Sequence, residues 1–319
     1  MKKIIIYNLI VLFSLFCILE FVSYLYVRYD AGDFLTEIKK IAKIEGNKMP
    51  TQRYAPVKLY EQSNYGDYYR KTLVSTNKNS KKGSVLFFGC SYTYGSYLDE
   101  NETISAVVNK KTGRTTINRG MEGGGIYNTI YDLKNEKFYE DIPQAPEYIV
   151  YTFINDHLNR ISIPYKASII FNHDNPVYYL NFGYKEENGE LVENRPSKFI
   201  LPFYGLYTVK AWHYLYANRF AHTTKEEKML SLLNATKKIT DSKFPTSKFV
   251  IIDYKDGGRC LMQESLKQNL IKNGFIIYHA EELAGHELDS EKWRGPDKEH
   301  PSAAAIEDVA NGLIKNLNL

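Results

Sequence analysis

Apolar positions along the chain fall into short runs, separated by turns and by segments with helical periodicity. Five runs rich in β-branched and aromatic residues lie at 84–88, 115–118, 148–153, 249–253 and 275–278. Stretches of helical character lie at 104–111, 126–136, 225–239, 264–273 and 302–317. Short apolar runs that alternate with helices are typical of buried strands in a parallel sheet. The pattern therefore predicts an α/β fold with functional groups at the carboxyl ends of the strands.

Two segments depart from this alternation. Residues 31–81 are polar and rich in tyrosine, and we interpret them as a stalk and approach segment before the folded domain at 82–319. Residues 161–245 contain a hairpin-like stretch, 177–184 and 190–192 about a turn at 187–189, and then an aromatic stretch at 199–220. We interpret this region as an insertion over the site. Its segment 203–216 is either an amphipathic helix packed on the core or a cap that faces substrate or membrane.

The N-terminus is a candidate membrane anchor. Residues 4–27 are almost wholly apolar or aromatic, and as a helix they would be about 36 Å long, enough to cross a hydrocarbon core of about 30 Å. Lys2 and Lys3 precede the segment, which keeps the N-terminus cytoplasmic. We therefore expect a single-pass anchor at 1–30, with the domain periplasmic or on the cell surface. A cleaved signal peptide is the alternative, although the end of the segment lacks small residues.

Composition narrows the possible partners. The net charge of +4 is spread along the chain without a basic stripe, so we expect no nucleic-acid partner. The 27 tyrosines suit ordinary packing as well as surfaces that stack on sugars. Of the three cysteines, Cys17 lies in the apolar N-terminus. A disulfide between Cys90 and Cys260 could therefore form in an oxidising compartment. The cysteines lack zinc-type spacing, and we expect no metal or other cofactor.

A serine and a histidine stand out as candidate catalytic residues. Ser91 lies in the turn 89–95, directly after the first core strand, where its hydroxyl would project above the sheet. Such a serine needs a base and a group that orients the base. His300 follows Asp297 in one short loop, so a carboxylate and an imidazole can meet there. A structural turn serine and Cys90 as a catalytic thiol are the alternatives.

Donors for a developing oxyanion could come from two further loops. A glycine-rich loop at 118–125 follows the second strand, and Asn155 follows the third. The spacing of these glycines matches neither a dinucleotide fingerprint nor a P-loop. We interpret His157, two residues after Asn155, as structural or as a support for neighbouring site residues, with a catalytic role as the alternative.

These four stretches, in this order, resemble the four blocks of the SGNH/GDSL hydrolase family over residues 82–319. The resemblance implies a three-layer α/β/α sandwich of flavodoxin-like kind. It implies that Ser91 is the nucleophile, that His300 is the base and that Asp297 orients it. The oxyanion donors would be Ser91, Gly123 and Asn155, with Gly120 as an alternative to Gly123. The sequence departs from the family pattern in two places, since Cys90 replaces an aspartate and Phe153 stands where a glycine is usual.

The resemblance also implies acyl transfer. Membrane-anchored proteins of this family often modify acetyl groups of polysaccharides, so we expect a serine esterase acting on O-acyl, above all O-acetyl, esters of a cell-envelope or exported polysaccharide. A polysaccharide O-acetyltransferase would use the same residues. A non-catalytic glycan-binding or scaffold protein and a lipase at the membrane are further alternatives, because a fold does not fix a function.

Overall fold

The structure is a computed structural model. It describes residues 11–24, 74–75, 83–121, 124–134, 142, 144–162, 184–187, 190–193, 224–255 and 261–319. Of the predicted stalk at 31–81, only residues 74–75 belong to this described part.

A six-stranded sheet forms the centre of the domain, in the order β1-β3-β2-β4-β7-β8. Its strands are β1 (Val74–Ser75), β2 (Ser84–Gly89), β3 (Thr116–Gly120), β4 (Pro146–Ile154), β7 (Lys248–Tyr254) and β8 (Ile276–His279). The last five are the predicted strands, and all of them pair in parallel. Only β1 runs antiparallel to its neighbour among these described strands.

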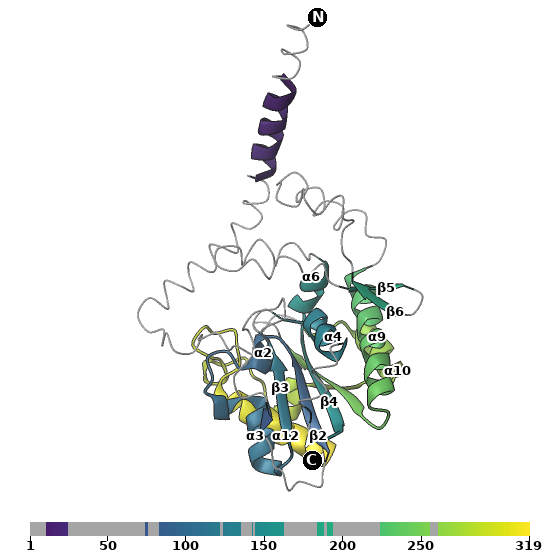
Figure 1. The fold of residues 1–319 in the computed structure, drawn as a ribbon. Coiled ribbons are helices and arrows are strands. Elements are labelled where there is room, and N and C mark those ends of the chain that lie inside the picture. The colour runs from purple at the N-terminus through teal and green to yellow at the C-terminus, as the bar shows by residue number, and fades with distance from the viewer. Residues whose placement is uncertain are drawn as a thin grey trace, which may run out of the picture. The chain divides into compact units, whose positions relative to one another are not determined.

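Helices cover both faces of the sheet (Figure 1). One face packs against α4 (Ile126–Lys134), α9 (Lys225–Lys243) and α10 (Glu264–Lys272). The other packs against α3 (Ile104–Thr112), α11 (Ala280–Ala284) and α12 (Ala303–Leu317). Neighbouring strand residues such as Phe87 and Phe88 point to opposite faces, and both are completely buried. Because both faces are covered, the strands read as continuous apolar runs, and the predicted parallel α/β sandwich is confirmed.

The boundaries of the predicted insertion need correction. Helix α9 fell inside the region 161–245, yet its Met229, Leu232 and Leu233 are buried in the core against the sheet. The domain therefore resumes at the start of α9. The hairpin consists of β5 (Tyr184–Glu187) and β6 (Glu190–Glu193), so β5 begins where the first predicted strand ends. Residues 177–183 and 199–220 lie outside the described part of the chain.

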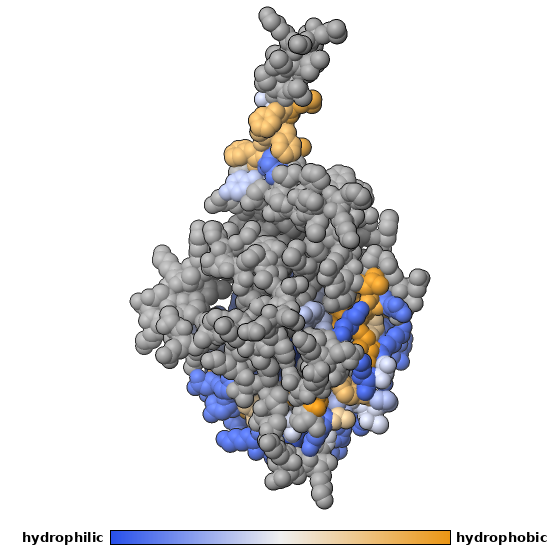
Figure 2. Space-filling view, in the orientation of Figure 1, coloured by the Kyte–Doolittle hydropathy of each residue, from blue (hydrophilic) through white to orange (hydrophobic). Residues whose placement is uncertain are grey.

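Residues 11–24 form a helix. Most of its large apolar side chains are exposed, and they are orange in Figure 2. Within the described ranges, no helix is both long enough and apolar enough to cross a membrane. Residues 4–10 and 25–27 of the predicted span lie outside those ranges.

Candidate active site

The turn after β2 presents Ser91 at the edge of the sheet. Gly89, the last residue of β2, has φ +145°, and a Cβ atom there would lie 2.5 Å from the Thr93 hydroxyl, so only glycine fits. Ser91 then begins the short helix α2 (Ser91–Tyr94) and is 6% exposed. The first N–H groups of a helix have no acceptor inside it. The backbone N–H of Ser91 is therefore available to a substrate atom.

Buried polar contacts hold this turn in place. The hydroxyl of Thr93 lies 2.6 Å from that of Thr152 on β4. The side-chain amide of Asn118 donates to the carbonyl of Thr93 at 2.9 Å and accepts from the N–H of Gly120 at 2.9 Å. At Gly120 an added Cβ would lie 2.1 Å from the backbone nitrogen of Tyr94, which shows how closely β3 approaches α2. Asn118 therefore positions the turn that carries Ser91.

Ser91, His300 and Asp297 meet at this edge of the sheet. The Nε2 atom of His300 lies 2.7 Å from the hydroxyl of Ser91, although the two residues are 209 positions apart. The Nδ1 atom of the same ring forms a short hydrogen bond with a carboxylate oxygen of Asp297. With the proton on Nδ1, the ring donates to Asp297 and leaves Nε2 to accept the proton of Ser91.

The carboxylate of Asp297 is locked within its own loop. Its second oxygen accepts from the backbone N–H groups of Glu299, at 3.1 Å, and His300, at 3.0 Å. Lys298 has φ +63°, so the backbone turns back between the carboxylate and the imidazole. Burial alone would raise the pKa of Asp297, but its hydrogen bond with the ring, the ring's charge and these N–H groups outweigh burial and lower it. Asp297 is therefore ionised when His300 becomes protonated.

Two tyrosine rings lie beside the imidazole, a feature that the sequence pattern does not predict. The ring centroids of Tyr92 and Tyr97 lie 5.1 Å and 5.7 Å from that of His300. Tyr97 is half-buried and has φ +65°, a conformation that is rare for an aromatic residue. Backbone strain of this kind is concentrated at functional sites.

Of the two further candidate oxyanion donors, Asn155 and Gly123, the structure describes only one. Asn155 directly follows β4 and is half-exposed, whereas Gly123 lies outside the described residues. Arg160 on α6 (Asp156–Ser162) connects the end of β4 with the glycine-rich loop after β3. It donates to the carboxylate of Asp156 at 2.8 Å and to the carbonyl of Gly124. Arg160 thus holds together the neighbours of both predicted donors. The four-residue spacing of Asp156 and Arg160 was a signal for this pair in the sequence.

His157 has the structural environment that was expected for it. The side chain is completely buried, and its Nδ1 lies 2.8 Å from the hydroxyl of Tyr151. Burial, together with the charge of Arg160, lowers the pKa of His157 well below its usual value. The ring is therefore neutral and supports α6 and β4.

Cys90 is poorly suited to nucleophilic chemistry. The residue is completely buried and forms no disulfide, while Cys260 lies outside the described residues. Burial raises the pKa of the Cys90 thiol, and the thiolate is the reactive form.

Replacing Cys90 with alanine is therefore expected to leave any reaction that depends on Ser91 within a few-fold of wild type, at a cost of about 1 kcal/mol in stability. Steady-state rates and thermal unfolding of both proteins check this. A folded Cys90→Ala variant as inactive as Ser91→Ala would show that the thiol takes part.

Comparisons with known proteins yield structural similarities only. No model of a protein family and no curated protein matches the sequence. Similar solved structures include a protein described as a GDSL-like lipase from Bacteroides ovatus ATCC 8483, at 10% identity and a TM-score of 0.36, covering 74% of this chain and 51% of that one. An acetyl xylan esterase from the rumen bacterium Butyrivibrio proteoclasticus has 11% identity and a TM-score of 0.39, covering 74% and 63%. A carbohydrate esterase family 2 enzyme from Corynascus thermopiles (Myceliophthora fergusii) has 13% identity and a TM-score of 0.39, covering 74% and 65%.

The chain thus spans between half and two thirds of the length of these three proteins. At such low identity their names do not assign a substrate to this chain. A reaction can be proposed only from the contacts among its own residues.

Proposed function

We propose that this chain is a serine esterase of the SGNH/GDSL type that acts on O-acetyl esters of a cell-envelope or exported polysaccharide. One observation carries the proposal: the hydroxyl of Ser91 lies 2.7 Å from Nε2 of His300, and Asp297 binds the other ring nitrogen. A serine hydroxyl becomes a useful nucleophile when a base removes its proton during attack.

The proposed reaction has two halves. The oxygen of Ser91 attacks the ester carbonyl carbon while its proton passes to Nε2 of His300, and the charge of Asp297 stabilises the imidazolium. The tetrahedral intermediate expels the sugar oxygen, which takes the proton from Nε2, and an acetylated serine remains. Water then attacks this ester, gives its proton to His300, and acetate leaves as the serine oxygen regains a proton.

The negative oxygen of each intermediate needs donors fixed in advance. We assign this role to the backbone N–H of Ser91, the side-chain amide of Asn155 and the N–H of Gly123. The N–H of Ser91 has no acceptor inside its helix. Asn155 follows β4, which pairs directly with β2, the strand that precedes Ser91.

A glycan ester as substrate is supported by the surroundings of His300 and by the four-block sequence resemblance. Tyr97 is a half-buried aromatic ring beside the base, and such rings pack well on the apolar face of a sugar.

Acetate release from O-acetylated polysaccharides, with transfer to an added unacetylated glycan followed in parallel, tests this function on the full-length chain. Release of acetate supports an esterase, and transfer in preference to release supports an O-acetyltransferase. Glycan binding without either reaction would support a non-catalytic glycan-binding protein. A preference for long acyl chains over acetate would support a lipase.

We also propose that residues 4–27 anchor the chain in a membrane with the catalytic domain outside the cytoplasm. The exposed apolar side chains along residues 11–22 support this. Extraction of cell membranes with alkaline carbonate should leave the chain in the pellet, and its release into the supernatant would contradict the proposal.

A further inference from the structure

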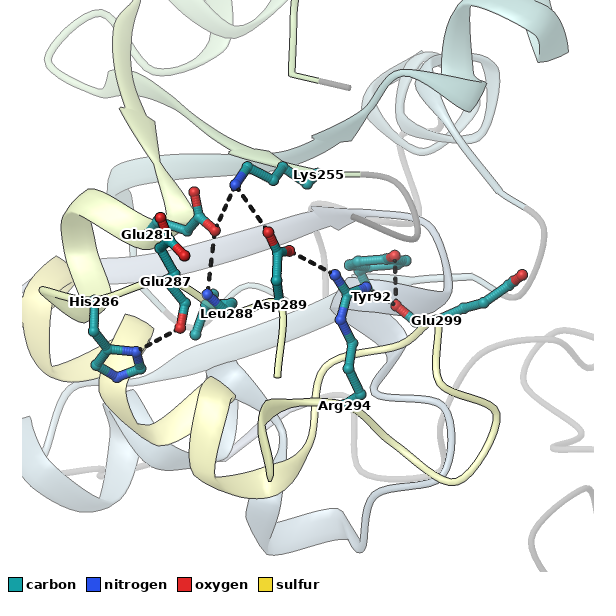
Figure 3. Close-up of polar contacts among 9 residues, drawn as sticks. All are labelled: Tyr92, Lys255, Glu281, His286, Glu287, Leu288, Asp289, Arg294 and Glu299. Atoms are coloured by element: carbon teal, nitrogen blue, oxygen red, sulfur yellow. Dashed lines mark hydrogen bonds and ion pairs between the residues drawn. The ribbon is translucent and has the colours of Figure 1, made fainter. Parts of the chain in front are cut away.

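A chain of polar contacts runs from α11 and the end of β7 to the loop that carries His300 (Figure 3). Lys255 lies 2.8 Å from Glu281 and 3.2 Å from Asp289. The other oxygen of Asp289 accepts from the guanidinium of Arg294 at 2.9 Å. None of these four residues belongs to the Ser91–His300–Asp297 relay.

The chain ends on the carbonyl oxygen of Glu299, the residue directly before His300. Arg294 donates to this oxygen at 3.1 Å. The hydroxyl of Tyr92 donates to the same oxygen at 2.9 Å, and Tyr92 is the residue directly after Ser91. The carbonyl of Glu299 is therefore held by two donors, Tyr92 from helix α2 and Arg294 from the same loop as His300.

The guanidinium of Arg294 is oriented before it reaches this carbonyl. Its side chain is 11% exposed, and a planar guanidinium bound to a carboxylate has little rotational freedom. Backbone contacts close the same loop, because the N–H of Gly295 donates to the carbonyl of His300 at 2.6 Å and Arg294 forms a β-bridge with Pro301. Arg294 is thus fixed relative to the residues on both sides of the imidazole.

We propose that Arg294 and Tyr92 are positioning residues that place Nε2 of His300 against the hydroxyl of Ser91 by holding the carbonyl of Glu299 between them. This inference rests on the proposed esterase function. Neither side chain is required to touch the substrate, so their loss should lower kcat and leave KM unchanged. Misplacement of a catalytic group by about 1 Å can cost about 100-fold in rate.

Arg294→Gln, Tyr92→Phe and the double variant test the proposal in the full-length chain. We expect kcat for p-nitrophenyl acetate to fall about 10-fold in each single variant, and the double variant to lose more than the product of the two, since the carbonyl then has neither donor. Arg294→Lys should retain part of the rate. Added guanidinium chloride at millimolar concentration should partly restore Arg294→Ala. A merely structural role predicts no such rescue.

Lys111→Gln is the matched control, because it removes a cation paired with Glu307 at 2.7 Å on the surface, away from the site. Tyr92→Phe removes one oxygen and keeps the ring, so it remains informative if the arginine variants do not fold. Single variants that are folded and within twofold of the wild-type kcat would overturn the proposal. An increase in KM at unchanged kcat would also overturn it.

Amide hydrogen exchange of residues 297–300 separates failure of this proposal from failure of the proposed function. Faster exchange in Arg294→Gln than in wild type is expected whether or not the chain hydrolyses esters. Unchanged exchange would overturn the positioning role, even in an active esterase. Faster exchange in a chain whose wild type has no Ser91-dependent activity would overturn the proposed function alone.

Discussion

Replacing Ser91 with alanine is expected to lower kcat for p-nitrophenyl acetate by about 10⁴-fold or more, because the acyl group then has no oxygen to receive it. Thermal stability should change little, since the substitution removes one hydroxyl whose partner, His300, still reaches solvent. Stopped-flow or steady-state rates of the full-length protein, with thermal unfolding as a check on folding, provide the measurement.

Ser105→Ala is a suitable control for this variant. Ser105 is also buried and also hydrogen-bonded through its hydroxyl, but it lies on α3 and contacts Thr103. Its loss should leave kcat within about twofold of wild type. A Ser91→Ala variant that also stays within about twofold of wild type would mean that the hydrolysis measured does not depend on Ser91.

Replacing Asp297 with asparagine is expected to lower kcat by about 100-fold to 10⁴-fold with a small effect on KM. The amide retains the size of the side chain but has no charge to stabilise the imidazolium, and it can stabilise the wrong tautomer of His300. Asp308→Asn is a matched control, because Asp308 also pairs with a histidine, His286, at 3.0 Å, and neither residue is part of the proposed relay. A folded Asp297→Asn variant with the wild-type kcat would remove Asp297 from the mechanism.

The lowered pKa of Asp297 gives this variant a pH signature. A carboxylate whose pKa is lower in the folded state stabilises the fold above its unfolded pKa of about 3.9, and this stabilisation is lost as the pH falls through the lower folded value. The difference in unfolding free energy between wild type and Asp297→Asn should therefore be largest at neutral pH and should decrease below pH 4. Denaturant unfolding of both proteins at neutral pH and below pH 4 measures this difference.

Much of the fold could be predicted because each buried strand is a short apolar run between turns. Strands such as β2 and β7 are covered on both faces, so their burial is visible in local composition. The limits of the insertion were harder to predict from the sequence. Helix α9 has a largely polar sequence, and only three-dimensional packing shows that Met229 and Leu233 belong to the core.

The candidate site was predictable where its parts are local. Asp297 and His300 lie in one loop, and Ser91 lies two residues after the glycine that ends a strand, so each was recognisable from neighbouring residues. The bond from Tyr92 to Glu299 joins residues 207 positions apart and has no local signature. Arg294 was missed for a related reason, because its effect depends on Asp289 and on a backbone carbonyl that is not visible in side-chain patterns.

Covalent labelling of Ser91 tests the central claim most directly. The full-length protein is treated with a fluorophosphonate, which reacts with serines activated by a base, and the labelled peptide is identified by mass spectrometry. We predict one label per chain on Ser91, strongly slowed in His300→Ala and absent in Ser91→Ala. Labelling of a different serine, or labelling of Ser91 at the same rate in His300→Ala, would contradict the account.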